Sequence, residues 1–401
     1  MEGTLLIKRI WSFKACIYTT ALLGIACAVC GCGKGEDEYE AGLKAMKTEN
    51  YSEAAISFKA AVDANKDKAE YAICYGMALI HTGEYEEAIA QFDSAISEKD
   101  NKIVRENNKQ AYRGKGIASY NLGDYTTAVE NFRTALDIPE LSELNDDMRG
   151  YILDIQLMLG ETKKALDTCT ECIDKDPKNA KYYLKRGQLY QKLGKYDAAI
   201  HDFDEALSYD DEQYECYFGK YEANLSLMKD EEARKALEQV VQIKVKTGAD
   251  SCFQGRAYQK LGDLEKAKSC FEEAAEKEYA DAYFYLGNML KDEKEYDRAL
   301  ENYNKYVEIL KEKSGGVVYN QMALCQAAKS DYEAALQSVE TGLARKDADI
   351  MKELMKNQVI ITEKTGDFAT AKTLANDYLK QFPDDEEMEQ ELAFIKTRVV
   401  K

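Results

Sequence analysis

Residues 180–213 read AKYYLKRGQLYQKLGKYDAAIHDFDEALSYDDEQ, and this pattern recurs along nearly the whole chain. Its apolar and small residues keep helical spacing in two segments, which Gly194 separates. Gly187 and Ala199 fall where two antiparallel helices must approach closely, although Gly within a helix costs about 1 kcal/mol relative to Ala. Tyr190 and Phe203 fill the remaining space. The stretch therefore predicts a hairpin of two helices.

These residues resemble the tetratricopeptide repeat, which has a Gly and an aromatic residue on its first helix, then Ala, an aromatic residue and Ala on its second. The same frame finds copies that start near residues 35, 69, 109, 146, 180, 214, 248, 280, 316 and 352. The copies near 146 and 214 keep the pattern least well. The spacing is longest before the third copy, where extra residues around 102–108 predict a longer helix or loop.

The resemblance implies an all-α fold, a right-handed α-solenoid of ten hairpins over residues 37–383. Each hairpin of such a solenoid buries its apolar face against its neighbours. Residues 384–401 predict a capping helix, because acidic residues begin the segment and basic residues end it, which complements the helix dipole. Its apolar stripe consists of Met388, Leu392, Ile395 and Val399.

The first 31 residues do not follow the repeat and have the form of a secretory signal. Three basic residues precede an apolar run over residues 15–29. The segment Val29-Cys30-Gly31-Cys32-Gly33 resembles a bacterial lipobox. That resemblance implies cleavage before Cys32, a diacylglycerol on its thiol and a short tether over residues 32–36. We thus expect a lipid anchor on the extracytoplasmic side of a bacterial cell membrane; an uncleaved membrane span or a plain signal peptide is the alternative.

The chain is acidic, with 73 Asp and Glu against 54 Lys and Arg and a net charge of −19. Such a surface repels phosphate backbones and anionic lipid head groups. We therefore expect no nucleic-acid partner. Attachment to a membrane would depend on the N-terminal lipid anchor alone.

The eleven cysteines and two histidines do not form a pattern typical of catalysis. Cys169 and Cys172 form a Cys-x-x-Cys pair, but they occupy the frame positions of Phe203 and Ala206, which predicts core residues. A redox pair needs exposed thiolates at a helix start, and a zinc site needs further ligands. The histidines lie in separate copies. We expect no catalytic residue, no metal and no cofactor.

A binding surface is predicted on the first helices of successive hairpins, which line the concave face of solenoids of this type. From the fifth to the eighth copy this face combines cations, amides and aromatic rings, which suit an extended peptide. The alternative is that the cations only balance neighbouring carboxylates. The predicted peptide-binding residues are Lys181, Gln188, Lys192, Phe218, Phe253, Arg256, Lys260, Tyr285 and Asn288.

A second candidate surface lies in the first two copies, where apolar residues follow the same face. They would bind an amphipathic helix, or pack against the N-terminal tether. The residues are Tyr39, Leu43, Met46, Ile73, Met77 and Ile80. The Lys and Asn trio by which some members of the family hold a terminal carboxylate is not found in any three adjacent first helices.

The function that these patterns favour is a non-catalytic scaffold, anchored as a lipoprotein at the cell envelope, that binds protein or peptide partners. One alternative is an envelope protein that captures a glycan or small ligand, which would need aromatic rings around a closed pocket. The other is a cytoplasm-facing assembly module with an N-terminal membrane span.

Expression in a bacterial host tests the lipid anchor. We expect intact-mass measurement to show loss of residues 1–31 and a diacylglyceryl mass on Cys32, and the product to partition into detergent. Cys32→Ala should abolish both, because the thiol is the atom that is acylated. A chain of full, unmodified mass would contradict the lipoprotein prediction.

Overall fold

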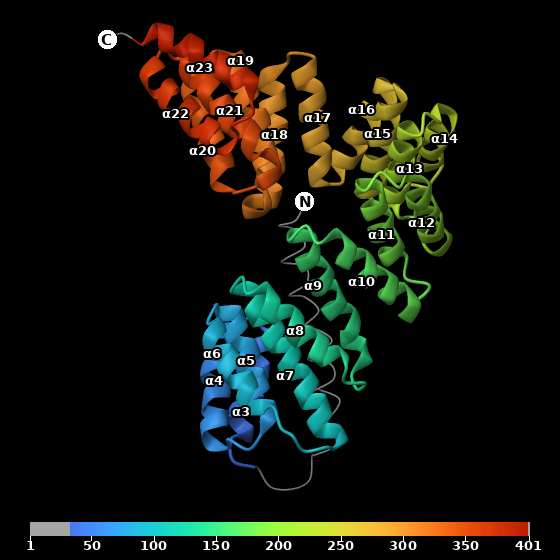
Figure 1. Cartoon of the computed structure of the whole chain (residues 1–401), viewed down its shortest axis with the longest axis vertical. Helices are drawn as coiled ribbons and strands as arrows, with labels where there is room; N and C mark the ends of the chain where they lie inside the picture. Colours follow the sequence, from blue (N-terminus) through green and yellow to red (C-terminus); the bar gives the residue numbers. More distant parts are fainter. Residues whose placement is uncertain (1–32, 400–401) are drawn as a thin grey trace. The chain divides into compact units, whose positions relative to one another are not determined.

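The computed structural model describes residues 33–399, and every regular element in this range is helical (Figure 1). The helices α3 to α22 pair in chain order into ten hairpins, and α23 follows the last of them. The predicted all-α solenoid of helix hairpins is therefore confirmed. The chain divides into two compact units, the N-terminal unit up to residue 211 and the C-terminal unit from residue 212.

The N-terminal unit contains five hairpins, each formed by two helices that are adjacent in sequence. They are α3 (Glu36–Lys47) with α4 (Tyr51–Ala64), α5 (Ala69–Thr82) with α6 (Tyr85–Ala95), α7 (Lys102–Asn121) with α8 (Tyr125–Leu136), α9 (Asn145–Met158) with α10 (Thr162–Lys175), and α11 (Ala180–Lys192) with α12 (Tyr196–Tyr209). A short 3-10 helix, Ser142–Leu144, precedes α9.

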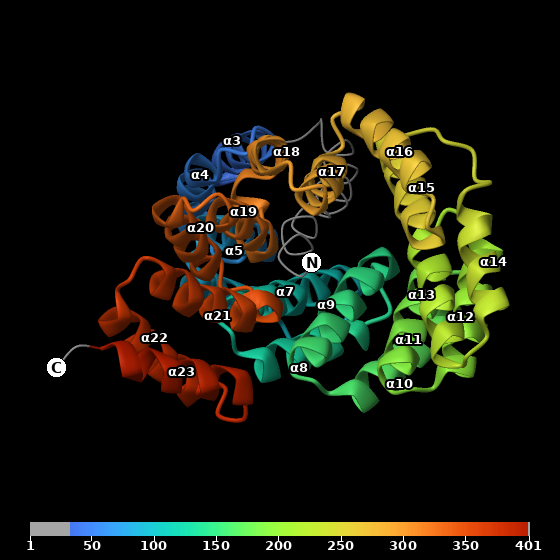
Figure 2. The ribbon, with the colours of Figure 1, turned by 90° about the horizontal axis from the view of Figure 1, so that it is seen from above.

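The C-terminal unit contains five further hairpins and the last helix. They are α13 (Tyr214–Ser226) with α14 (Asp230–Val240), α15 (Gly248–Leu261) with α16 (Leu264–Glu276), α17 (Ala280–Asp292) with α18 (Tyr296–Leu310), α19 (Gly316–Ala328) with α20 (Tyr332–Ala344), and α21 (Ala348–Lys364) with α22 (Phe368–Gln381), followed by α23 (Glu386–Arg398). Figure 2 shows α13, α14, α15 and α16 side by side from a second direction.

A contact between glycine and an aromatic ring holds the two helices of most hairpins together. In the α11–α12 hairpin, a Cβ on Gly187 would lie 2.7 Å from Cε1 of Phe203, so only glycine leaves room for the ring. Phe203 is fully buried. The same pairing occurs at Gly42–Phe58, Gly76–Phe92, Gly116–Phe132, Gly255–Phe271 and Gly287–Tyr303. Close packing against the ring offsets the cost of a glycine within a helix.

The helix α7 begins at Lys102, although the repeat frame placed the start of this copy near residue 109. The extra residues lengthen the helix rather than a loop. Asn101 caps it by accepting a hydrogen bond from the backbone N–H of Val104 at 3.1 Å. The added residues include Arg105, whose Nε donates to Glu140 at 2.7 Å, and just beyond them the buried Lys109 donates through Nζ to the backbone oxygen of Ile138 at 2.7 Å. The helix α21 likewise begins at Ala348, ahead of the expected start near 352.

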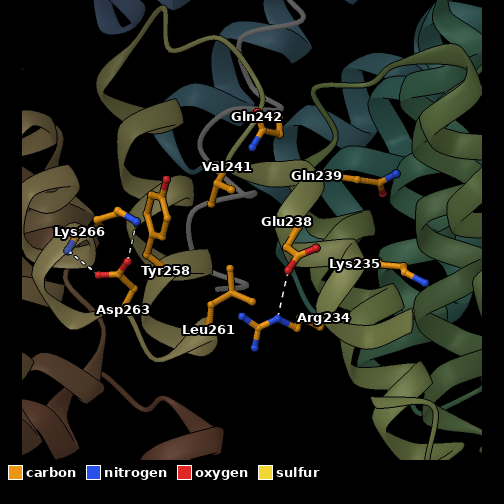
Figure 3. A pocket seen from close by; sticks show the side chains of 10 residues that line it. All are labelled: Arg234, Lys235, Glu238, Gln239, Val241, Gln242, Tyr258, Leu261, Asp263 and Lys266. Carbon is orange, nitrogen blue, oxygen red and sulfur yellow. Dashed lines mark hydrogen bonds and ion pairs between the residues drawn. The ribbon is translucent and has the colours of Figure 1, made fainter. Parts of the chain in front are cut away.

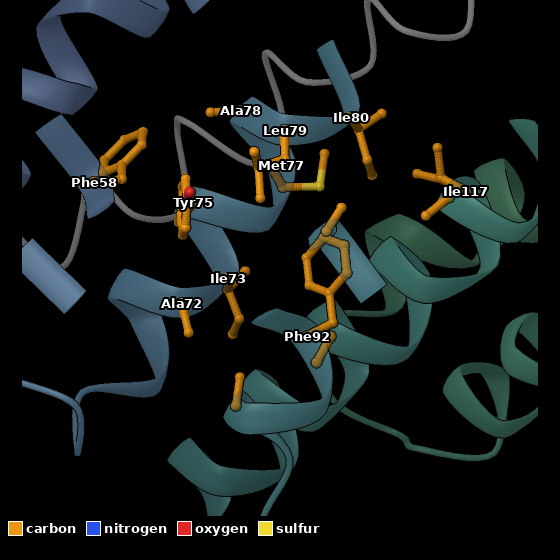
Figure 4. Close-up of a cluster of buried hydrophobic side chains, with 14 of the residues drawn as sticks. Phe58, Ala72, Ile73, Tyr75, Met77, Ala78, Leu79, Ile80, Phe92 and Ile117 are labelled. Atoms are coloured by element: carbon orange, nitrogen blue, oxygen red, sulfur yellow. The ribbon is translucent and has the colours of Figure 1, made fainter. Parts of the chain in front are cut away.

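The apolar residues around α5 are buried in the core of the N-terminal unit. Figure 4 shows Ile73, Met77 and Ile80 gathered with Phe92 and Ile117. Tyr39 and Met46 are also buried, and Leu43 packs against the same cluster. The strip suggested as a docking surface for an amphipathic helix therefore belongs to the core and does not form an exposed surface.

The helix α23 covers the end of the C-terminal unit, as predicted. Met388 and Ile395 are fully buried against α22. Asp385 fixes the start of the helix, because its carboxylate accepts from the backbone N–H of Met388 at 3.1 Å and from the hydroxyl of Tyr378 at 2.6 Å. Lys352 lies 3.1 Å from the same carboxylate. These contacts, that of Tyr378 first, hold the pKa of Asp385 well below its usual range.

Cys32 and the segment predicted as an export signal lie outside the described residues. From residue 33 to residue 399, no helix combines the length and the apolar character that crossing a membrane requires.

Gly187→Ala tests the glycine contact. We expect it to destabilise the protein by about 1–2 kcal/mol, because the overpacking cost exceeds the gain in helix propensity. Phe203→Leu in the same chain should remove most of that penalty. Urea unfolding followed by circular dichroism measures both, with the exposed neighbour Gln188→Ala as control. A Gly187→Ala protein as stable as the Gln188→Ala control would show that the contact imposes no constraint.

The junction of α21 and α23 should respond to pH. Burial, and then the neighbouring carboxyl of Glu391, raise the pKa of Glu363 from 4.5 to about 7. The folded protein therefore holds a proton that the unfolded chain releases. This stabilisation is fully present below the unfolded pKa and is lost as pH rises through the folded pKa.

We expect Glu363→Gln to flatten the dependence of the melting temperature on pH between about 5 and 8. At the upper end it should stabilise the protein by less than about 1 kcal/mol, because solvent screens the partly exposed pair. Glu340→Gln, at an exposed position on α20, is the control. Identical melting curves for wild type and Glu363→Gln across this range would refute the coupling.

Candidate functional site

Four predicted residues come together in the C-terminal unit, on three successive first helices. The guanidinium carbon of Arg256 on α15 lies 4.4 Å from the ring centre of Phe218 on α13. It lies 5.1 Å from the ring centre of Phe253 on α15 and 5.7 Å from that of Tyr285 on α17. Distances below about 6 Å are those of cation–π contacts. We term these four residues the Arg256 cluster.

The ring of Phe253 is held in place by a chain of contacts that begins at the start of α15. Asp250 completes a capping box with Thr247 and accepts from the Tyr214 hydroxyl at 3.0 Å. Tyr214 in turn stacks on Phe253, with ring centres 4.5 Å apart and planes inclined by 11°. Burial opposes ionisation of Asp250, but hydrogen bonds from the backbone N–H of Lys246 and Thr247 outweigh it and lower its pKa. The carboxylate therefore stays ionised and keeps its acceptor role.

The ring of Tyr285 is held by the repeat core. It stacks on Phe271 with ring centres 5.0 Å apart and planes inclined by 9°. Phe271 is fully buried in the α15–α16 hairpin, where it contacts Gly255. The rings of Phe253 and Tyr285 are thus fixed before any ligand arrives, because the packing of the repeats holds them.

The guanidinium of Arg256 is half-buried, and it makes no hydrogen bond or ion pair with any residue between 33 and 399. Other poorly exposed arginines do have carboxylate partners. Arg186 pairs with Asp202 at 2.7 Å, and the Arg113 guanidinium contacts the Asp147 carboxylate at 2.5 Å. Arg256 therefore differs from them in keeping its N–H donors unused.

Asp281, at the start of α17, is a carboxylate that interacts electrostatically with Arg256 and Tyr285. Burial raises the pKa of Asp281, while the Tyr279 hydroxyl and the charge of Arg256 lower it. The Tyr279 hydroxyl donates to it at 3.3 Å. Within residues 33–399, Asp281 and Arg256 interact electrostatically but form no ion pair with each other.

The remaining predicted residues are placed differently. Asn288 accepts a hydrogen bond from the buried Tyr303 hydroxyl at 2.8 Å, and Lys260 lies over the Tyr221 ring at 5.0 Å and 3.9 Å from Glu222. Within the Arg256 cluster itself, Phe218 is only 5% exposed, because it lies under Arg256 instead of facing solvent.

The three predicted residues on α11 belong to the N-terminal unit and do not join the cluster. Lys181, Gln188 and Lys192 are all exposed there. That the nine residues bind peptide stays a prediction, and the structure brings only four of them together.

Sequence reasoning missed Tyr214 and Asp281, which shape the cluster. Asp281 precedes Tyr285 by four residues, the spacing that places two side chains on one helical face. That spacing was a usable signal. The role of Tyr214 depends on its contacts with α15, which a repeat frame does not contain.

Besides the Arg256 cluster, the C-terminal unit has a hollow beside α14, α15 and α16, which we term the second hollow (Figure 3). Its volume is about 810 Å³. Two of its cations already have carboxylate partners, Arg234 with Glu238 at 3.1 Å and Lys266 with Asp263 at 2.8 Å. Its charges are therefore balanced internally, unlike that of Arg256.

The Cys-x-x-Cys pair is buried, in agreement with the core role expected for it. Cys169 and Cys172 have no solvent-exposed surface. Burial raises the pKa of Cys169 to about 12 and that of Cys172 to about 11, so neither forms a thiolate readily. Across residues 33–399, no three His, Cys, Asp or Glu side chains are grouped as metal ligands would be.

Sequence models of the tetratricopeptide repeat match residues 39–103, 180–212 and 254–315. These segments are tetratricopeptide repeats. The third includes Arg256 and Tyr285, which are two of the four residues of the Arg256 cluster.

Curated relatives share only parts of the chain. DnaJ homolog subfamily C member 7 homolog of Dictyostelium discoideum is 23% identical over 239 residues, which cover 56% of this chain and 44% of that protein. Photosystem I assembly protein Ycf3 of Prochlorococcus marinus is 29% identical over 125 residues, 29% of this chain and 72% of that protein.

Similar solved structures include the APC/C hetero-tetramer Cut9–Hcn1, at 12% identity and a TM-score of 0.45, covering 91% of this chain and 96% of that one. YrrB, described as a TPR protein with an unusual peptide-binding site, is 20% identical with a TM-score of 0.38, covering 53% of this chain and 97% of that one.

Proposed function

We propose that this chain is a non-catalytic scaffold that binds a peptide or protein partner on the first-helix face of its tetratricopeptide repeats. The observation that supports the proposal most directly is the Arg256 cluster. Three successive repeats contribute to it, and its cation makes no hydrogen bond or ion pair within residues 33–399. Aromatic and Arg side chains supply most of the binding energy at protein interfaces.

The construction of the cluster favours binding over a purely structural role. Phe253 and Tyr285 are half-buried, so each ring keeps a surface that a ligand can cover. Stacking on Tyr214 and Phe271 already restricts both rings. A partner therefore loses little side-chain entropy when it orders them, and that lowers the cost of association.

A glycan or small-ligand capture protein fits this site less well. Such a protein needs rings around an enclosed pocket. In the Arg256 cluster, the space between the rings is taken by the guanidinium of Arg256 itself. The cluster thus offers one cation flanked by rings, which suits a side chain of an extended peptide.

The proposal includes attachment to the extracytoplasmic side of a bacterial membrane through a lipidated Cys32. It rests on the lipobox-like sequence alone, and the Cys32→Ala comparison tests it. Little sequence separates Cys32 from α3, which begins at Glu36. An anchored chain would hold its first repeats close to the membrane surface, where its negative charge favours standing off from anionic lipids.

Peptide binding by the full-length chain in detergent tests the scaffold function. We expect a pool of random dodecapeptides to contain ligands that lose at least tenfold in affinity, about 1.4 kcal/mol, on Phe253→Ala or Tyr285→Ala. The physical reason is the loss of a prearranged ring surface. Equilibrium binding to the immobilised protein, with peptides identified by mass spectrometry, provides the measurement.

Tyr258→Ala is the matched control, since Tyr258 lies on the same helix α15 but lines the second hollow. It should leave affinity unchanged, and melting temperatures should confirm that every variant folds. Absence of any ligand, or equal loss in the Tyr258→Ala variant, would overturn the proposal.

A further inference from the structure

We infer that the Arg256 cluster recognises the side-chain carboxylate of an Asp or Glu within an extended peptide segment. The inference rests on the proposed function and names the chemical group that this function selects. Two observations support it: the N–H donors of Arg256 have no acceptor within residues 33–399, and three aromatic rings surround the guanidinium.

Within residues 33–399, Arg256 forms no direct ion pair, although the protein has a large excess of carboxylates and Asp281 lies within electrostatic range. A guanidinium carries five N–H donors and stays protonated at any physiological pH. Arginines of similar exposure in this chain, such as Arg186 and Arg345, have carboxylate partners. The acceptor that Arg256 lacks within residues 33–399 is the group that a ligand would supply.

The three rings favour a carboxylate as that group. Cation–π contacts use the face of the guanidinium, while its N–H groups lie in its plane. Planar, paired donors match the two oxygens of a carboxylate and form charge-assisted hydrogen bonds. The rings also restrict water around the site, which strengthens the pairing. Tyr285 and Phe253 would cover the apolar part of the same ligand residue or its neighbours.

An internal residue fits better than a chain terminus, because the cluster extends to both sides of Arg256. On the side of the preceding repeat lies the half-buried Tyr221 of α13, with Lys260 over its ring, and on the side of the following repeat lies the half-buried Tyr285. Beyond Tyr285 on α17, the half-buried Asn288 follows on the same helix. A peptide that continues past the carboxylate in both directions would meet surface in both, whereas a terminal carboxylate would use one side only.

Asp281 limits the number of acidic groups that the site accepts. Its half-buried carboxylate belongs to α17, as does Tyr285, and it lies within electrostatic range of Arg256. A second acidic residue beside the first would meet that negative charge. A backbone N–H of the peptide could instead donate to Asp281. The site should therefore prefer a single carboxylate among uncharged neighbours.

Four pools of nonapeptides test the inference with the full-length chain in detergent. Three pools are acetylated and amidated, have uncharged random flanks, and carry Glu, Gln or Lys at the centre. The fourth carries Gln at the centre and a free carboxyl terminus. We expect the Glu pool to bind at least tenfold more tightly than the Gln pool, about 1.4 kcal/mol.

Substitutions at Arg256 should change the preference for the Glu pool over the Gln pool. Melting curves verify that the variants stay folded. Arg256→Gln should abolish the difference between Glu and Gln pools, Arg256→Lys should reduce it, and Arg256→Glu should favour the Lys pool. Asp281→Asn should tighten binding of the Glu pool. Arg234→Gln removes an arginine of α14 that is paired with Glu238, and should leave the preference unchanged.

The outcomes distinguish a failure of the carboxylate inference from a failure of the proposed peptide-binding function. Equal binding of the Glu and Gln pools, still weakened by Phe253→Ala, would overturn the carboxylate inference and leave peptide binding intact. Preference for the free carboxyl terminus would overturn the internal side chain as the source. Failure of every pool to bind the wild-type chain would overturn both proposals.

Discussion

The close contact between a first-helix glycine and the aromatic ring of the second helix is the constraint on which the rest of the structure depends. In the hairpins where it occurs, it turns one side of the first helix toward the second helix of the same hairpin. The next residue along the helix is rotated by about 100° and leaves that contact. Gly187, Gly255 and Gly287 are followed by Gln188, Arg256 and Asn288, all of them outside the fully buried core. These three of the nine residues predicted for binding thus occupy their positions because of the core contact.

The same constraint explains how a regular array can hold a local site. Phe271 fills the space beside Gly255 and presents its other face to Tyr285, so one buried ring supports both the hairpin and the cluster. Tyr214 acts similarly between Asp250 and Phe253. Side chains at equivalent places in other repeats have different neighbours. The site is therefore a property of three particular repeats.

Sequence was sufficient for the hairpins but insufficient for features that depend on distant contacts. The periodic residues predicted all the pairs of helices and the capping helix. The sixth copy matched weakly because Met228 stands where Gly194 stands in the copy before it, yet Met228 adopts the same left-handed backbone at φ +58. Buried Ala233 and Leu237 support that hairpin. The extra residues before the third copy were compatible with a longer helix or a longer loop, and sequence could not decide between them, because the contact of Arg105 with Glu140, 35 residues later, is not part of a repeat frame.

In the candidate site, too, sequence predicted what the repeat pattern determines and missed what depends on contacts between helices. The repeat frame predicted that Phe253, Arg256 and Tyr285 share a face, since it specifies which helical positions leave the core. It could not show that Arg186 has a carboxylate partner and Arg256 has none, because pairing depends on where the facing helices place their acids. Nor could it show that Lys181, Gln188 and Lys192 lie in a different unit from the other six residues.

The acidity of the whole chain and the single cation of the site act over different distances. At physiological salt the field of the many surface carboxylates falls off within about 8 Å, so it opposes acidic ligands mainly on approach. A carboxylate that paired with Arg256 would be at contact distance from its charge, where the local attraction outweighs the screened field. In a ligand with many acidic residues, each one would be repelled by the surface carboxylates, but only one could pair with Arg256. A ligand with one carboxylate among apolar residues gains the same pairing with little repulsion, so the surface charge itself sharpens the selectivity of the site.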